Sequence, residues 1–167
     1  MKVIKDYTQF NNSELKEYIE SFHPSFKKGI YRKFDYDHII DYDMQHIQPS
    51  DELMHDIKKI LKSYISNTEF IFLKCCLNRI LVNTNETDGF HNDWNSGDLV
   101  LLHYPYLDFK GGELEWLEDD ISNIINIEAG LNLILNNNPY HRVLNVTEGI
   151  RYSFAFFFKK INKKELL

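Results

Sequence analysis

The stretch GFHNDWNSG at 89–97 holds a histidine and an aspartate separated by one residue. Neutral imidazole and ionised carboxylate groups both bind transition metals, and two histidines with one carboxylate form a common three-ligand face at redox-active iron. Alternate residues of an extended segment point the same way, so His91 and Asp93 can face a single ion. The third ligand must come from elsewhere in the chain. The candidates are the other histidines: His23, His38, His46, His55, His103 and His141.

His141 differs from the other candidates in its surroundings. It follows the strand-like segment LNLILNNNPY and precedes RVLNVTEGIRYSFAFFF, which contains Arg151 and Ser153. The segments between Asp93 and His141 are long enough for a return path across a jelly roll. The chain therefore carries, in order, His-x-Asp, a distant His and an Arg-x-Ser pair in its final strand.

Residues 78–158 resemble the Fe(II)- and 2-oxoglutarate-dependent dioxygenases, most closely their prolyl-hydroxylase-like branch. The resemblance is carried by HND at 91–93, LHYPYLDFKGGELEWL at 102–117, IEAGLNLIL at 127–135, HRVLNV at 141–146 and GIRYSFAFFF at 149–158. It implies a double-stranded β-helix and a catalytic iron held by His91, Asp93 and His141. It also implies 2-oxoglutarate and O₂ as co-substrates, with ascorbate as a candidate reductant.

The resemblance further implies a binding site for the co-substrate. Arg151 would anchor the distal carboxylate of 2-oxoglutarate, with Ser153 as a hydroxyl partner. A guanidinium is always charged and offers two parallel donors to a carboxylate, which suits this role. The family often has a tyrosine whose hydroxyl reaches the co-substrate, and Tyr104 and Tyr106 are both candidates because Pro105 can disturb the register. Leu81 stands where the family has an aromatic residue.

The implied reaction is hydroxylation of a C–H bond in a peptide, an amino acid or a small metabolite, with release of succinate and CO₂. Trp94 and Arg79 are candidate substrate contacts, although Trp94 can equally be a packing residue and Arg79 can extend to the surface. Two other functions stay open. One is a nucleic-acid demethylase of the same chemistry, and the other is a jelly-roll module that binds without catalysis.

Composition narrows these options. The formal net charge of −6 argues against a nucleic-acid surface, which is usually basic. No apolar run approaches the roughly 20 residues that span a bilayer, and the first ten residues lack a signal-like run. We therefore expect a cytoplasmic protein without a membrane partner. Cys75 and Cys76 are adjacent in an apolar segment, where two buried thiols are a simpler interpretation than a disulfide or a thiolate metal site.

The elements expected to position these residues fall into two parts of one domain spanning 1–167. Residues 1–68 are expected to form a helical N-terminal support, with one helix capped by Asn11 and Glu14 and a second capped by Ser50. Residues 69–160 contain short runs rich in β-branched and aromatic residues, separated by Gly, Asn and Asp, as in an antiparallel sandwich or barrel. The predicted fold is mainly β (α+β), with a double-stranded β-helix core and the N-terminal helices on one outer face.

Overall fold

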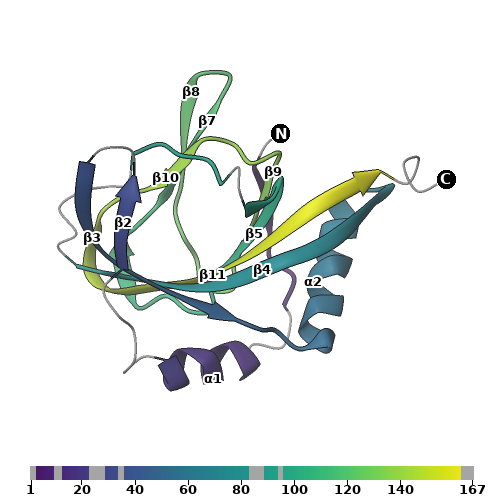
Figure 1. The fold of residues 1–167 in the computed structure, drawn as a ribbon, viewed down its shortest axis with the longest axis horizontal. Coiled ribbons are helices and arrows are strands. Elements are labelled where there is room, and N and C mark those ends of the chain that lie inside the picture. The colour runs from purple at the N-terminus through teal and green to yellow at the C-terminus, as the bar shows by residue number, and fades with distance from the viewer. Residues whose placement is uncertain are drawn as a thin grey trace.

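The fold has three layers, with a large sheet in the middle, two helices on one face and a small sheet on the other (Figure 1). The computed structural model describes residues 3–9, 13–22, 29–33, 36–82, 89–93 and 96–162. All strand pairs in these ranges are antiparallel. The structure thus confirms the predicted fold class, a jelly-roll core with helices on an outer face.

The large sheet contains eight strands, and its centre is the long pair β4 and β11. The order across it is β1 (Val3–Asp6), β9 (Asn132–Asn136), β5 (Leu99–His103), β11 (Val146–Asn162), β4 (Thr68–Leu81), β3 (Tyr36–Ile47) and β2 (Gly29–Lys33), with β6 (Phe109–Gly111) paired to β11. The small sheet has the order β10 (His141–Val143), β7 (Leu114–Glu118) and β8 (Ile121–Ile125). Its β7–β8 hairpin extends beyond the rest of the molecule (Figure 1).

The helices are α1 (Ser13–Phe22) and α2 (Asp51–Tyr64). Ser50 caps α2 as predicted, because its hydroxyl accepts a hydrogen bond from the backbone N–H of Leu53 at 3.2 Å. Glu14 contacts the same serine, accepting from its N–H at 2.8 Å and its hydroxyl at 2.6 Å. The predicted cap Asn11 lies outside the described residues. Glu14 therefore ties α1 to the start of α2.

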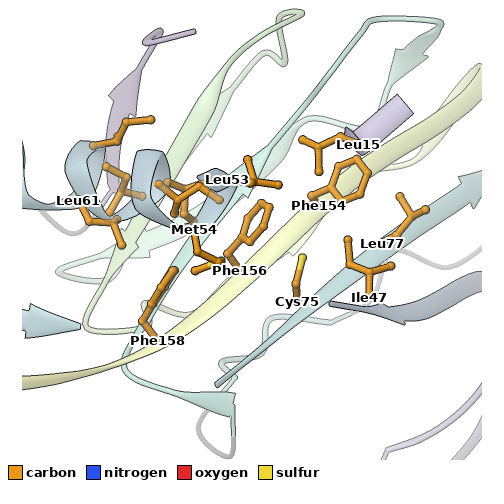
Figure 2. Packing of buried hydrophobic residues seen from close by; sticks show 14 of the residues in the cluster. Leu15, Ile47, Leu53, Met54, Leu61, Cys75, Leu77, Phe154, Phe156 and Phe158 are labelled. Atoms are coloured by element: carbon orange, nitrogen blue, oxygen red, sulfur yellow. The ribbon is translucent and has the colours of Figure 1, made fainter. Parts of the chain in front are cut away.

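An apolar cluster fills the layer between the helices and the large sheet. Figure 2 shows Phe154 and Phe156 of β11 and Leu77 of β4 meeting residues of both helices, among them Leu15 and Leu53. Each leucine, isoleucine or phenylalanine that is fully buried here stabilises the fold by roughly 1.5–3 kcal/mol relative to an exposed one. This cluster packs both helices against one face of the large sheet.

The alternation of side chains along β4 and β11 separates this cluster from a second one. Cys75 and Phe154 face the helices, whereas Cys76 and Ala155 belong to a buried cluster between the two sheets. Both cysteines are buried free thiols, as the sequence indicated. The same two strands therefore carry a structural face and a face directed at the small sheet.

The region before residue 68 contributes more than helices. Its strands β1, β2 and β3 extend both edges of the large sheet, and β1 is not indicated by the sequence pattern. The segment YRKFDYDHIIDYDMQHI, which the sequence leaves open between strand and loop, runs through β2 and β3. In the described part of the chain, neither helix is long and apolar enough to cross a membrane.

Candidate active site

A cavity of about 170 Å³ opens between the large and the small sheet. It is lined by side chains from β3, β4, β5, β7, β10 and β11 and from the segment that follows Gly89: Met44, Lys74, Cys76, Asn78, His91, Asp93, Ser96, Leu102, Leu114, His141, Val143, Arg151, Ser153, Ala155 and Phe157. The cavity thus collects five residues that the sequence singled out, although they come from three separate parts of the chain.

Backbone pairing brings His91 and His141 together. Each donates its N–H to the other's carbonyl, at 3.0 Å for His91 and 2.8 Å for His141. Their ring centroids are 4.6 Å apart. His141 is itself held in β10, opposite Trp116 of β7. The small sheet therefore fixes one imidazole directly and the other through this bridge.

Both imidazoles are oriented by backbone carbonyls. His91 Nδ1 lies 3.0 Å from the carbonyl oxygen of Gly89, and His141 Nδ1 lies 2.8 Å from that of Pro139. A carbonyl only accepts, so the proton of each neutral ring is on Nδ1 and the lone pair is on Nε2. Metal-binding histidines are commonly fixed in this way by a hydrogen bond from the other ring nitrogen.

Asp93 completes the group of donors. Its Oδ2 lies 3.7 Å from Nε2 of His141, and its side chain is 23% exposed. A metal ion about 2.1 Å from each of two donor atoms can join atoms up to about 4.2 Å apart, so this separation is within reach of one ion. Among the described residues, no group of three or more His, Cys, Asp or Glu side chains is already assembled as a metal site. The chemistry of these donors and the orientation of the two imidazoles fit a ferrous ion.

Arg151 is a buried cation at another part of the same cavity. It is only 2% exposed, and its Nε donates to the carbonyl of Gly112 at 3.0 Å. Its two terminal nitrogens donate to the hydroxyls of Ser153 at 3.4 Å and Tyr104 at 2.9 Å. Among the described residues, Arg151 thus donates to one carbonyl and two hydroxyls and to no carboxylate. A buried charge is costly without a counter-ion, so this guanidinium suits an anionic ligand.

The two tyrosine candidates lie in different surroundings. Tyr104 is fully buried against Arg151, with the guanidinium carbon 5.0 Å from its ring centroid, and it is not among the residues that line the cavity. Tyr106 packs in the helix-side cluster, with its ring 6.0 Å from that of Tyr152. Burial raises the pKa of Tyr106 to about 12, and the nearby Tyr152 adds to this effect. Tyr104 is therefore the tyrosine whose hydroxyl binds the Arg151 guanidinium.

The structure describes only one of the two candidate substrate residues. Trp94 lies outside the described residues. Arg79 does not line the cavity, because it alternates with Asn78 along β4 and shares the helix-facing side with Leu77. The structure thus gives no support for a contact between Arg79 and a substrate. Leu81, at the end of β4, pairs with Ile150 and does not line the cavity either.

The sequence did not identify several other residues in or next to the cavity as site residues. Gly112 does not line the cavity, but its carbonyl oxygen accepts from Arg151 and so orients it. Lys74, Cys76 and Asn78 line the cavity from β4, and the ammonium of Lys74 lies 4.8 Å from the ring centroid of Phe157. Burial raises the pKa of the Cys76 thiol, an effect that Lys74 opposes and Asp93 supports, so this thiol is protonated at neutral pH. The alternation along β4 was the available signal for these three residues.

Comparison with known proteins places this geometry in context. No protein-family model and no curated protein matches the chain. Solved structures do match, including an oxidoreductase of the 2OG-Fe(II) oxygenase family from Burkholderia pseudomallei, with 17% identity, a TM-score of 0.68 and coverage of 96% of this chain and 86% of that one.

Prolyl hydroxylases are among the structures that match over similar lengths. A prolyl-4-hydroxylase from Pseudomonas putida has 12% identity and a TM-score of 0.67, covering 94% of this chain and 92% of that one. The viral collagen prolyl hydroxylase of Paramecium Bursaria Chlorella virus-1, in its 2OG complex, has 14% identity and a TM-score of 0.67, covering 95% and 96%. At such identities the likeness establishes the fold, and this chain has the fold of these oxygenases.

Proposed function

We propose that this protein is an Fe(II)- and 2-oxoglutarate-dependent dioxygenase that hydroxylates a C–H bond. The observation that carries the proposal is one cavity lined by the imidazoles of His91 and His141, the carboxylate of Asp93 and the buried guanidinium of Arg151. A redox-active ferrous site needs the donors, and a dicarboxylate co-substrate needs the cation. The fold shared with 2OG-Fe(II) oxygenases agrees with this assignment.

The residues divide the work between metal and co-substrate. His91, Asp93 and His141 would hold Fe(II), which together with 2-oxoglutarate and O₂ supplies the oxidising chemistry and yields succinate and CO₂. Arg151 would bind the distal carboxylate of 2-oxoglutarate, and Ser153 lines the cavity beside it. The Tyr104 hydroxyl accepts from Arg151 and so keeps the guanidinium in position. The apolar side chains in the lining, among them Leu102, Leu114 and Phe157, would limit the access of water to the reacting groups.

The substrate proposed is a peptide, an amino acid or a small metabolite. Proteins of this fold include a prolyl hydroxylase from Trichoplax adhaerens in complex with a peptide fragment of hypoxia inducible factor, and HygX from Streptomyces hygroscopicus with nickel, 2-oxoglutarate and hygromycin B bound. One wall of the cavity consists of side chains from β3 and β4 that have no proposed role in binding the metal or the co-substrate: Met44, Lys74, Cys76 and Asn78. We therefore assign this wall to the substrate. The net charge of −6 disfavours nucleic acid.

The test is formation of succinate from 2-oxoglutarate by the full chain with added Fe(II) and ascorbate. We expect iron-dependent turnover by the parent protein and its loss, by at least 100-fold, in the His141→Ala variant, because the ion loses one of three protein ligands. His55→Ala is the matched control, since His55 is exposed on α2, far from the cavity lining. Turnover that survives in His141→Ala would rule out His141 as a ligand.

A complete lack of turnover and of iron binding in the parent protein would favour a binding module without catalysis. Once turnover is established, candidate substrates are compared by mass spectrometry for the addition of one oxygen atom.

A further inference from the structure

The turn between β9 and β10 lies next to the donor residues and has an unusual backbone. Asn137 and Asn138 both have left-handed φ angles, 58° and 47°. Asparagine adopts this conformation more readily than most residues, because its short side chain forms local hydrogen bonds. Asn137 is exposed, whereas Asn138 is only 7% exposed. The turn therefore directs one of its two amides into the protein.

The buried amide of Asn138 holds the segment that carries Asp93. Its Oδ1 accepts from the backbone N–H of Asp93 at 2.9 Å, and its Nδ2 donates to the carbonyl of Gly97 at 3.1 Å. One side chain thus uses both its acceptor and a donor to fix the two ends of the same short segment. The next residue in the turn, Pro139, provides the carbonyl that orients His141.

Among the described residues, backbone hydrogen bonds join the two histidines to each other, whereas Asp93 is held by the Asn138 side chain and, within its own segment, by the Ser96 N–H, which donates to the Asp93 carbonyl at 2.6 Å. His91 is joined to β10 by two backbone hydrogen bonds, and His141 is part of that strand. Asp93 lies beyond the last of these bonds, and its side chain is part-exposed. The far end of the segment is held independently, because Asp98 donates its N–H to the carbonyl of Phe158 at 3.2 Å. Among the described residues, Asn138 is therefore the side chain that joins the backbone of Asp93 to another segment.

We infer that Asn138 is a positioning residue that holds Asp93 in place for metal binding. The inference rests on the proposed function, because it takes Asp93 as a metal ligand. Asn138 touches neither the metal nor a substrate and acts through the backbone of Asp93. Metal sites lose affinity when the groups that hold their ligands are removed, typically by 10–100-fold. Loss of this amide should therefore weaken and distort the site without removing a ligand.

The experiment is titration of the full-length, metal-free protein with Co(II), followed by the visible absorption of the bound ion. Asn138→Gly removes the amide while keeping a residue that tolerates the left-handed backbone. We expect it to weaken Co(II) binding about 10-fold or more and to change the absorption spectrum, which reports ligand geometry. Asn137→Gly is the matched control. It makes the same change one residue earlier, where the side chain contacts Lys160, and should leave both readouts unchanged.

The outcomes separate this inference from the proposed function. If the parent protein fails to bind Co(II), the proposed metal site is wrong. If the parent binds Co(II) and Asn138→Gly matches it in affinity and spectrum, Asn138 does not position Asp93. An equal loss in both glycine variants would also overturn the inference, because it would point to a general effect on the turn.

Discussion

At the scale of single residues, Arg151 offers the clearest test of whether the cavity binds 2-oxoglutarate as proposed. Arg151→Lys keeps the positive charge but loses the planar pair of donors that fits a carboxylate. We expect the KM for 2-oxoglutarate to rise by roughly 10-fold, because loss of about 1.4 kcal/mol of binding free energy corresponds to a factor of ten. The kcat at saturating 2-oxoglutarate should change less, since this contact is made equally before and during the reaction. Steady-state succinate formation measures both constants.

Arg79→Lys provides the control for Arg151→Lys. It is the same substitution in a paired strand, but Arg79 lies on the helix-facing side of the sheet. The KM for 2-oxoglutarate should be unchanged in this variant. An unchanged KM in Arg151→Lys as well would mean that the co-substrate binds elsewhere.

The types and order of residues in the sequence, with the family resemblance that they carry, predicted four site residues: His91, Asp93, His141 and Arg151. All four residues line one cavity. Asn138 could not be identified in the same way, because an asparagine beside a proline is an ordinary turn signal. Its role depends on a contact with a backbone N–H 45 residues away along the chain, which no local pattern encodes.

At the scale of elements, the turn between β6 and β7 positions Arg151, the proposed anchor of the co-substrate. Gly112 has φ +66°, and a Cβ added there would lie 2.8 Å from Cδ of Arg151 and 3.1 Å from Cγ2 of Val146. We expect Gly112→Ala to lower the free energy of unfolding by roughly 1–3 kcal/mol, from left-handed strain and crowding. It should also raise the KM for 2-oxoglutarate several-fold, because the guanidinium is displaced. Urea unfolding and succinate formation measure the two effects.

Gly130→Ala separates the backbone effect from the displacement of Arg151. Gly130 also has a left-handed φ, +79°, but a Cβ there would approach the exposed side chain of Gln9 at 3.0 Å. The variant should lose a comparable amount of stability and keep its KM for 2-oxoglutarate. If both alanine variants leave the KM unchanged, the turn does not control the position of Arg151.

Prediction of the elements succeeded where local signals are strong. Ser50 predicted the start of α2, where it caps the helix. The short strand β1 gave no such signal, because its residues VIKD are recognisable as a strand only through their pairing with β9. The order of strands is likewise a property of distant pairings.

At the scale of the whole molecule, a buried polar network joins the N-terminal strand to the core. Asn132 of β9 donates to the carboxylate of Asp6 in β1 at 2.9 Å, and its Oδ1 lies 2.8 Å from Nδ1 of His103 in β5. The hydroxyl of Tyr64 in α2 donates to the same carboxylate at 2.8 Å. Three strands and a helix thus meet at two titratable groups, and the stability of the fold should depend on their charge states.

Burial lowers the pKa of His103 to about 4, although the hydrogen bond with Asn132 opposes this. In the unfolded chain the pKa is about 6.5, so between these values the unfolded state binds a proton that the folded state does not. Stability therefore falls as the pH is lowered from about 6.5 to about 4, and levels off for this group below that. A difference of about 2.5 pKa units corresponds to about 3 kcal/mol.

Asp6 acts in a lower pH window. Burial would raise the pKa of this carboxyl, but hydrogen bonds from Asn132, Tyr64 and Thr8 outweigh burial and lower it. Its stabilisation is present above the unfolded pKa near 4 and is lost as the pH falls through the lower folded value. The two groups can therefore be separated by measuring at different pH values.

The prediction is tested by urea unfolding of the metal-free protein at a series of pH values, with a chelator present so that metal loss does not contribute. His103→Gln keeps a donor for Asn132 and removes the titrating ring, so its free energy of unfolding should fall less between pH 6.5 and 4, by about 3 kcal/mol. His55→Gln, at an exposed position of α2, should follow the parent protein. Parallel curves for the parent and His103→Gln would mean that His103 is protonated in the folded protein as readily as in the unfolded chain. In that case the acid sensitivity of the fold would arise from other groups.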